Sequence, residues 1–143
     1  MKLYETNEIR NIALLGHIGS GKTTLSEAML VISGTKEKMG NTLNGTTSSD
    51  YHKEEKEKHF SIRLSPLTME YQGHKYNILD YPGYEDFKGD IYSSIDIIDG
   101  AVLVIDGSSG IELGTINSWK LLEDNNIPRI IFINKMNKGF NNY

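Results

Sequence analysis

The stretch Gly16-His17-Ile18-Gly19-Ser20-Gly21-Lys22-Thr23-Thr24 decides the fold of this chain of 143 residues. Residues 9–15, just before it, form an apolar run of strand length, and apolar residues recur at helical spacing between 25 and 32. Gly34 is placed to end that helix. A strand, a glycine-rich loop and a helix in this order are the context of a phosphate-binding loop. The alternative, a glycine-rich turn that ends in a chance Gly-Lys-Thr, leaves this flanking pattern unexplained.

The residue types of this loop suit a polyphosphate ligand. Glycines let the backbone bend and bring its N–H groups close to phosphate oxygens, and the N-terminus of the following helix adds positive potential. In loops of this kind the lysine, here Lys22, reaches the β- and γ-phosphates, and the next hydroxyl, here Thr23, ligates Mg²⁺. The candidate phosphate-binding residues are His17, Gly19, Ser20, Gly21, Lys22, Thr23 and Thr24.

The composition is that of an ordinary soluble domain. Charged residues make up 24% of the chain and hydrophobic residues 38%, and the formal net charge is −4. This balance gives no reason to expect broad binding to nucleic acid or to a membrane surface. The absence of cysteine excludes disulfides and thiol chemistry. The sequence shows no apolar run long enough to span a bilayer and no apolar signal-peptide core, so we expect a cytoplasmic location.

A polar stretch and a hairpin follow the first helix. Residues 35–61 lack an apolar pattern and predict a long loop, which is uncommon inside a compact domain and usually functional. A strand interrupted at Pro66 is expected within 62–71. Residues 72–74 then form a turn, and 75–79 return as the next strand, which predicts an antiparallel pair.

Two further helices are expected, one at about 85–97 and one at 113–122. In the second, Leu113, Ile116 and Trp119 repeat at helical spacing and begin an apolar stripe. The last residues of the chain, from Gly139 onward, show no assignable pattern.

Two strands with continuous apolar sequence complete the pattern. Residues 101–105 and 129–133 are predicted to be buried strands of a parallel sheet. Strands that alternate with helices predict an α/β fold, with a mostly parallel sheet and one antiparallel hairpin strand. The whole chain, 1–143, is expected to be one domain.

Polar motifs follow three of these strands, at 16–23, 80–83 and 134–137. In open α/β sheets ligands bind at the carboxyl ends of the strands, so we expect the three motifs to converge there. Asp80, downstream of the phosphate-binding loop, is the expected Mg²⁺-side carboxylate, directly or through water. Gly83 is placed to offer its N–H to the γ-phosphate. The alternative role of Asp80 is to begin the turn at Tyr-Pro-Gly.

The third motif, Asn134-Lys135-Met136-Asn137, is close to the Asn-Lys-x-Asp sequence that reads guanine in GTPases. With it, the chain resembles the N-terminal GTP-binding domain of elongation factor G and its paralogues. This resemblance implies a three-layer P-loop fold, binding of GTP or GDP with Mg²⁺, GTP hydrolysis, and action on the ribosome through the full-length factor. The segments that carry it are Ile9 to Leu30, Gly45 to Tyr51, Glu54 to Ile62, Tyr76 to Phe87, Asp99 to Gly110, and Ile127 to Lys138.

The chain departs from the family pattern at several positions, among them Lys58-His59-Phe60 in place of Arg-Gly-Ile. Tyr84 stands where the family has the His that positions the attacking water, and Ser61 stands where it has a Mg²⁺-ligating Thr. Asn137 replaces the guanine-reading Asp, and Gly19 replaces the Asp of a His-x-Asp motif in the phosphate loop. These departures make the chain more similar to the divergent elongation-factor-G-like paralogues. The implied catalytic residues are Lys22, Gly83 and Tyr84.

The resemblance also implies one more strand and helix, with a further guanine-contacting loop, so the domain is expected to be incomplete. The strand at 129–133 would then have an unpaired edge, through which the chain is expected to self-associate. Two other functions remain open. One is a nucleotide sensor of the same fold with little hydrolysis, as Tyr84 suggests. The other is a P-loop ATPase, which the Asn-Lys-x-Asn ending disfavours.

Overall fold

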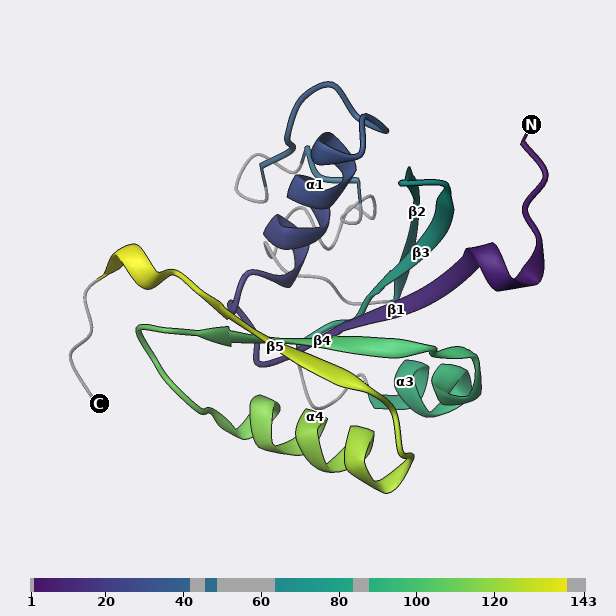
Figure 1. The fold of residues 1–143 in the computed structure, drawn as a ribbon. Helices are drawn as coiled ribbons and strands as arrows, with labels where there is room; N and C mark the ends of the chain where they lie inside the picture. The colour runs from purple at the N-terminus through teal and green to yellow at the C-terminus, as the bar shows by residue number, and fades with distance from the viewer. Residues whose placement is uncertain (1, 42–45, 49–63, 84–87, 139–143) are drawn as a thin grey trace.

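The computed structural model describes residues 2–41, 46–48, 64–83 and 88–138 (Figure 1). Within these residues, five strands form one sheet in the order β2-β3-β1-β4-β5. All neighbouring strands are parallel except β2 and β3, which confirms the predicted α/β class and its antiparallel hairpin. The elements are η1 (Thr6–Glu8), β1 (Ile9–Leu15), α1 (Lys22–Ile32), β2 (Ser65–Tyr71), β3 (His74–Asp80), α3 (Lys88–Ser94), η3 (Ile95–Ile97), β4 (Gly100–Asp106), α4 (Leu113–Asp124), β5 (Arg129–Asn134) and η4 (Met136–Lys138).

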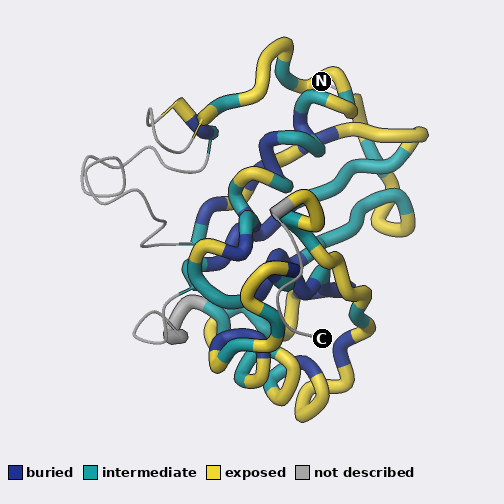
Figure 2. Tube along the Cα trace, turned by 90° about the vertical axis from the view of Figure 1, so that its left-hand side faces the viewer, coloured by how far each residue is buried: buried dark blue, intermediate teal, exposed yellow. Residues whose placement is uncertain are grey.

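Helices cover both faces of this sheet. Figure 1 shows α1 on one face and α3 and α4 on the other, so the molecule has three layers. Neighbouring residues of β1 point to opposite faces: Leu14 packs with Leu30 on the side of α1, whereas Leu15 packs with Leu122 on the side of α4. Both faces of the central strands are therefore buried, as their continuous apolar sequence requires. In Figure 2 the exposed positions gather in the loops and on the outer turns of the helices.

The hairpin of β2 and β3 closes through a two-residue turn. Gln72 and Gly73 both have positive φ, 47° and 83°, as hairpin turns whose twist matches the strands require. The predicted interruption at Pro66 was wrong, because Pro66 lies inside β2 and pairs with Leu79. An edge strand tolerates proline, since its outward-facing N–H needs no partner in the sheet.

The prediction that 129–133 is a buried strand was also wrong. β5 forms at that place but lies at the edge of the sheet, and four of its apolar side chains are 40–65% exposed. These side chains are Ile130, Ile131, Phe132 and Ile133. A strand becomes buried through its neighbours, and within the described residues β5 is paired on one side only.

Helix α4 turns a different face to the sheet from the one its apolar residues suggest. Leu113, Ile116 and Trp119 are 59%, 42% and 38% exposed. The buried positions are instead Gly114, Thr115 and Leu122. Gly114 lies close to the phosphate-binding loop, because a Cβ there would be 2.9 Å from the Cα of His17.

The other helices agree with their sequence signals. Gly34, with φ of 75°, follows the end of α1, and the helix predicted at 85–97 appears as α3 and η3. None of the helices in the described ranges is long and apolar enough to cross a membrane. Ser61, Tyr84, most of the polar stretch 35–61 and the tail from 139 lie outside the described residues.

Candidate functional site

The phosphate-binding loop joins β1 to α1 through a backbone that only glycine adopts easily. Gly16, Gly19 and Gly21 have φ of 141°, 74° and 98°, in the region where a Cβ is strained. At Gly16 a Cβ would also lie 2.2 Å from the Val104 carbonyl oxygen, so the backbone of β4 is in close contact with the loop. The hydroxyl of Ser20 is buried and has no hydrogen-bond partner among the described residues. A phosphate oxygen in this loop would satisfy it.

Lys22 begins α1, and its side chain folds back over the loop. Its ammonium donates to the carbonyl oxygens of Gly16 and His17 at 3.1 and 3.0 Å, and only 6% of the residue is exposed. Burial lowers the pKa of Lys22 to about 8, although the nearby Asp80 carboxylate works in the opposite direction. The ammonium therefore lies at the loop where a polyphosphate would bind. Since Asp80 alone does not offset the cost of its burial, a bound phosphate would further stabilise its charged form.

Thr23 and Asp80 meet at the ends of α1 and β3. The Thr23 hydroxyl donates to a carboxylate oxygen of Asp80 at 2.9 Å, and Asp80 is fully buried. A hydroxyl and a carboxylate are hard oxygen donors, and Mg²⁺ is usually held by one or two such groups together with phosphate oxygens. The pair therefore fits Mg²⁺ beside a nucleotide. Among the described residues, no group of three or more His, Cys, Asp or Glu side chains forms a separate metal site.

Gly83 lies directly against the phosphate-binding loop. A Cβ at this position would lie 2.6 Å from the Cα of Ile18 and 2.8 Å from the Lys22 ammonium nitrogen. The close approach of the two backbones needs a residue without a side chain. The loop after β3 and the loop after β1 thus lie side by side, as the sequence predicted for the carboxyl ends of the strands.

The motif after β5 is bonded to the same loop. Asn134 donates from its side-chain amide to the Ser20 carbonyl oxygen at 3.0 Å, and a Cβ on Gly21 would collide with that amide nitrogen at 2.2 Å. Lys135 donates to the Gly19 carbonyl oxygen at 2.5 Å. Lys135 has a positive φ of 58°, an uncommon conformation for a side-chain-bearing residue that places its ammonium at this point. Asn137 lies in η4 and is exposed, as is Thr24 on α1.

Asp106, at the end of β4, is a site residue that sequence reasoning missed. Its carboxylate pairs with the Lys135 ammonium at 2.6 Å and accepts from the Ser108 N–H at 2.9 Å. Burial raises the pKa of Asp106, but the bonds from Lys135 and Ser108 outweigh it and hold the pKa well below its usual value. An acidic residue at the end of an apolar strand was the available signal, the same one that identified Asp80.

The imidazole of His17 turns away from the loop and toward α4. Its Nδ1 accepts a hydrogen bond from the Gly114 N–H at 3.3 Å, and its Nε2 lies 3.5 Å from a carboxylate oxygen of Glu112. In this geometry Nδ1 is an acceptor and Nε2 faces the Glu112 carboxylate, so both ring nitrogens are directed at α4 and its N-terminal flank. We therefore expect any phosphate contact from His17 to come from its backbone.

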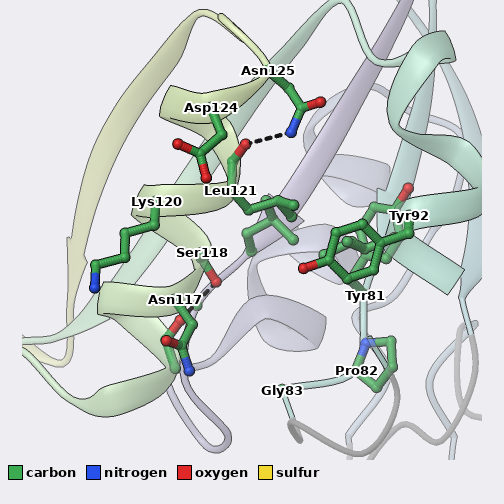
Figure 3. Close-up of a pocket in the computed structure, with 14 residues that line it drawn as sticks. Tyr81, Pro82, Gly83, Tyr92, Asn117, Ser118, Lys120, Leu121, Asp124 and Asn125 are labelled. Atoms are coloured by element: carbon green, nitrogen blue, oxygen red, sulfur yellow. Dashed lines mark hydrogen bonds between the residues drawn. The ribbon is translucent and has the colours of Figure 1, made fainter. Parts of the chain in front are cut away.

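A cavity of about 430 Å³ lies between α3 and α4, and Pro82 and Gly83 are among the residues that line it (Figure 3). In the figure the ring of Tyr92 lies opposite Leu121 of α4, and Ser118 and Asn117 follow along the same helix. Lys22, Thr23 and Asp80 are not among the residues that line this cavity. Gly16 and Gly83 do line it, so the cavity adjoins the place where the strand-end motifs converge.

The fold and this convergence define the class: a P-loop nucleotide-binding domain with the strand-end motifs of GTPases. Residues 7–142 match the family described as the elongation factor Tu GTP binding domain, and the chain belongs to that family. The predicted resemblance to elongation factor G is confirmed. The chain is 38% identical over 131 residues to elongation factor G of Granulibacter bethesdensis, a match to 92% of this chain and 19% of that protein.

The chain is equally similar to a second kind of relative. It is 39% identical over 133 residues to mitochondrial ribosome-releasing factor 2 of Drosophila ananassae, a match to 93% of this chain and 18% of that protein. A crystal structure of a Thermus thermophilus protein superposes with a TM-score of 0.89 at 38% identity, over 94% of this chain and 20% of that one. The chain thus spans about a fifth of the length of the proteins it matches.

Proposed function

We propose that this chain is the GTP-binding and GTP-hydrolysing domain of a ribosome-associated translation factor of the elongation-factor-G kind. The observation that carries the proposal is the junction of two motifs. The Asn134 amide and the Lys135 ammonium both bond to carbonyl oxygens of the phosphate-binding loop. A base-reading motif is thereby fixed to a phosphate-reading one, so that a single nucleotide can contact both.

In this proposal the phosphates lie over the loop and against the Lys22 ammonium. The candidate Mg²⁺ ligands are the oxygens of Thr23 and Asp80, joined by the Ser61 hydroxyl. Mg²⁺ would neutralise charge that develops on the phosphate oxygens during transfer. The ribosome would act on the intact factor, and cytoplasmic location remains a prediction.

Hydrolysis transfers the γ-phosphoryl group to water. The water oxygen bonds to the γ-phosphorus, the bond to the oxygen that bridges the β- and γ-phosphates breaks, and GDP and inorganic phosphate form. Gly83 offers a backbone N–H to the γ-phosphate, and Tyr84 orients the water. Because the pKa of a free tyrosine phenol is about 10, a tyrosine hydrogen-bonds a water and does not deprotonate it at neutral pH.

Base reading depends on Asn137. Asp at this position accepts from two guanine donors, whereas Asn offers one acceptor oxygen and a competing NH₂. An unsatisfied buried donor costs about 1–3 kcal/mol, or roughly 5- to 150-fold in affinity. We therefore propose that GTP is preferred over XTP only weakly, and that Asn137→Asp restores the preference. The structural alternative is that Asn137 only caps the turn after β5.

The decisive experiment compares GTP, GDP, ATP and XTP by calorimetry on the wild type and on Lys22→Ala. Guanine nucleotides should bind, and Lys22→Ala should weaken them severely without loss of fold, because its ammonium bonds to carbonyl oxygens of the loop rather than to the apolar core. Lys120→Ala, at an exposed lysine of α4, is the matched control. Tight binding of ATP in place of GTP, or unchanged binding by Lys22→Ala, would refute the proposal.

Turnover is measured separately, on the full-length factor with ribosomes. We expect slow intrinsic hydrolysis and a rise in ribosome-stimulated turnover for Tyr84→His, since positioned groups of this kind contribute about 10²–10⁴-fold. A lower turnover in that variant would show that Tyr84 itself supports catalysis better than histidine does at this position.

A further inference from the structure

His17 joins the phosphate-binding loop to α4 through both its main chain and its side chain. Its carbonyl oxygen accepts from the Lys22 ammonium at 3.0 Å and from the Ser20 N–H at 3.3 Å. Its ring nitrogen Nδ1 accepts from the Gly114 N–H at 3.3 Å, and Nε2 lies 3.5 Å from the Glu112 carboxylate. One residue therefore contacts both the candidate phosphate-binding cation and the first turn of α4.

The first turn of α4 takes a hydrogen-bond acceptor from outside the helix. The first N–H groups of a helix have no acceptor within it, and the side chain of the N-cap residue commonly supplies one. Within the described residues, Glu112 occupies the N-cap position of α4 but makes no capping hydrogen bond with its side chain. Its carbonyl oxygen accepts from the N–H groups of Thr115 and Ile116, whereas the N–H of Gly114 bonds to the His17 ring. His17 therefore caps α4 from a distant part of the chain.

The loop and the helix also approach each other closely at this point. Gly114 is buried, and a Cβ there would lie 2.9 Å from both the Cα and the Nδ1 of His17. Closely packed interiors transmit small displacements, because they hold few voids that could absorb them. A shift of α4 therefore moves the residue whose carbonyl oxygen holds the Lys22 ammonium.

We propose that His17 is a positioning residue, which ties the phosphate-binding loop to α4 so that nucleotide binding and the packing of the first turn of α4 stabilise each other. The inference rests on the proposed nucleotide site. A bound nucleotide fixes the loop and with it the acceptor for the Gly114 N–H, and thermodynamic linkage makes this coupling reciprocal. The loop backbone holds phosphates that GDP and GTP share, so loss of the tie weakens the binding of both.

Three substitutions of His17 separate a positioned acceptor from a general packing role. In asparagine the acceptor oxygen is bonded to Cγ, as Nδ1 is in histidine, whereas in glutamine it lies one bond further from the backbone. By calorimetry with GDP, His17→Ala and His17→Gln should bind roughly 2- to 10-fold more weakly, and His17→Asn should bind like wild type. His74→Ala is the control, because its ring contacts a local carbonyl oxygen, that of Gln72, at 3.2 Å. Equal affinities of the Asn and Gln variants would overturn the inference.

Gly114→Ala tests the same contact from the side of α4. Alanine favours a helix more than glycine does, so without a role for the contact this variant should bind GDP normally and melt no lower than wild type. The added Cβ displaces His17, so we expect GDP affinity to fall by a similar factor to that in His17→Ala. Lys120→Ala also places alanine on α4, at an exposed position, and should leave the affinity unchanged. Unchanged GDP affinity in Gly114→Ala would overturn the inference.

Amide hydrogen exchange at Gly114 distinguishes failure of this inference from failure of the proposed function. In the nucleotide-free protein the Gly114 amide should exchange faster in His17→Ala and at the wild-type rate in His17→Asn. GDP should slow this exchange in wild type, and it should do so much less in His17→Ala. Exchange that neither His17→Ala nor GDP alters would overturn the tie between the loop and α4. A wild type that binds no guanine nucleotide, yet shows faster exchange in His17→Ala, would instead refute the proposed function and with it the coupling to nucleotide binding.

Discussion

The side-chain amide of Asn134 donates to the carbonyl oxygen of Ser20 at 3.0 Å, across 114 residues of sequence. This bond ties the end of β5 to the loop between β1 and α1. The Gly21 Cα lies directly under the same amide, since a Cβ there would be 2.2 Å from its nitrogen. The side chain therefore covers the loop as well as bonding to it.

Asn134→Ala should loosen the phosphate-binding loop. A typical hydrogen bond contributes about 0.5–1.5 kcal/mol, so we expect guanine-nucleotide affinity to fall roughly 2- to 10-fold. Asn125→Ala is the control, because Asn125 also donates from its amide to a backbone carbonyl, that of Leu121, at 2.8 Å. Equal affinity losses in the two variants, measured by calorimetry, would contradict a specific role for Asn134.

Gly16→Ala should destabilise the fold more than Gly19→Ala. Both positions have positive φ, which costs an L-residue about 1–2 kcal/mol. Only at Gly16 does the added Cβ also meet a backbone atom, the Val104 carbonyl oxygen at 2.2 Å, whereas at Gly19 no atom lies within 4 Å. Urea denaturation of both variants measures the difference. Equal urea midpoints for the two variants would contradict the prediction, because they would show that β4 shifts to make room for the added Cβ at little cost.

Nucleotide affinity should fall above pH 8 because of Lys22. Burial lowers the pKa of its ammonium to about 8 in the nucleotide-free protein. A bound polyphosphate favours the charged form and raises that pKa, so binding takes up a proton above pH 8 and costs up to about tenfold in affinity per pH unit. Below pH 8 the group is already charged and contributes no slope. Calorimetry in buffers of different ionisation enthalpy counts the protons, and Lys22→Ala should abolish this uptake.

The outer edge of β5 should mediate self-association. Ile131 and Ile133 are 53% and 50% exposed on a strand that ends the sheet within the described residues. An exposed apolar edge pairs readily with another chain, and a lysine in such a strand discourages that pairing. Ile131→Lys should therefore shift light scattering toward the monomer. Ile111→Lys, at a residue 72% exposed outside the sheet, is the control. A wild type that stays monomeric at high concentration and melts cooperatively would contradict this prediction.

The sequence by itself determined the local backbone and the order of the elements. The predicted strand 9–15 coincides with β1, and the strand predicted at 101–105 extends by one residue at each end in β4. The glycines of the phosphate-binding loop were expected to let the backbone bend, and Gly16, Gly19 and Gly21 do so with positive φ. These features depend on neighbours in the chain, because backbone freedom and apolar periodicity act over a few residues.

The tertiary structure alone decided which surfaces are buried and which polar groups meet. β5 is exposed because strand order places it at an edge, and α4 turns Gly114 inward because it packs against His17. Asp106 and Glu27 gained their partners in the same way, from segments that fold back on them. A residue's own neighbours do not specify such contacts, since they depend on where elements distant in sequence come to lie.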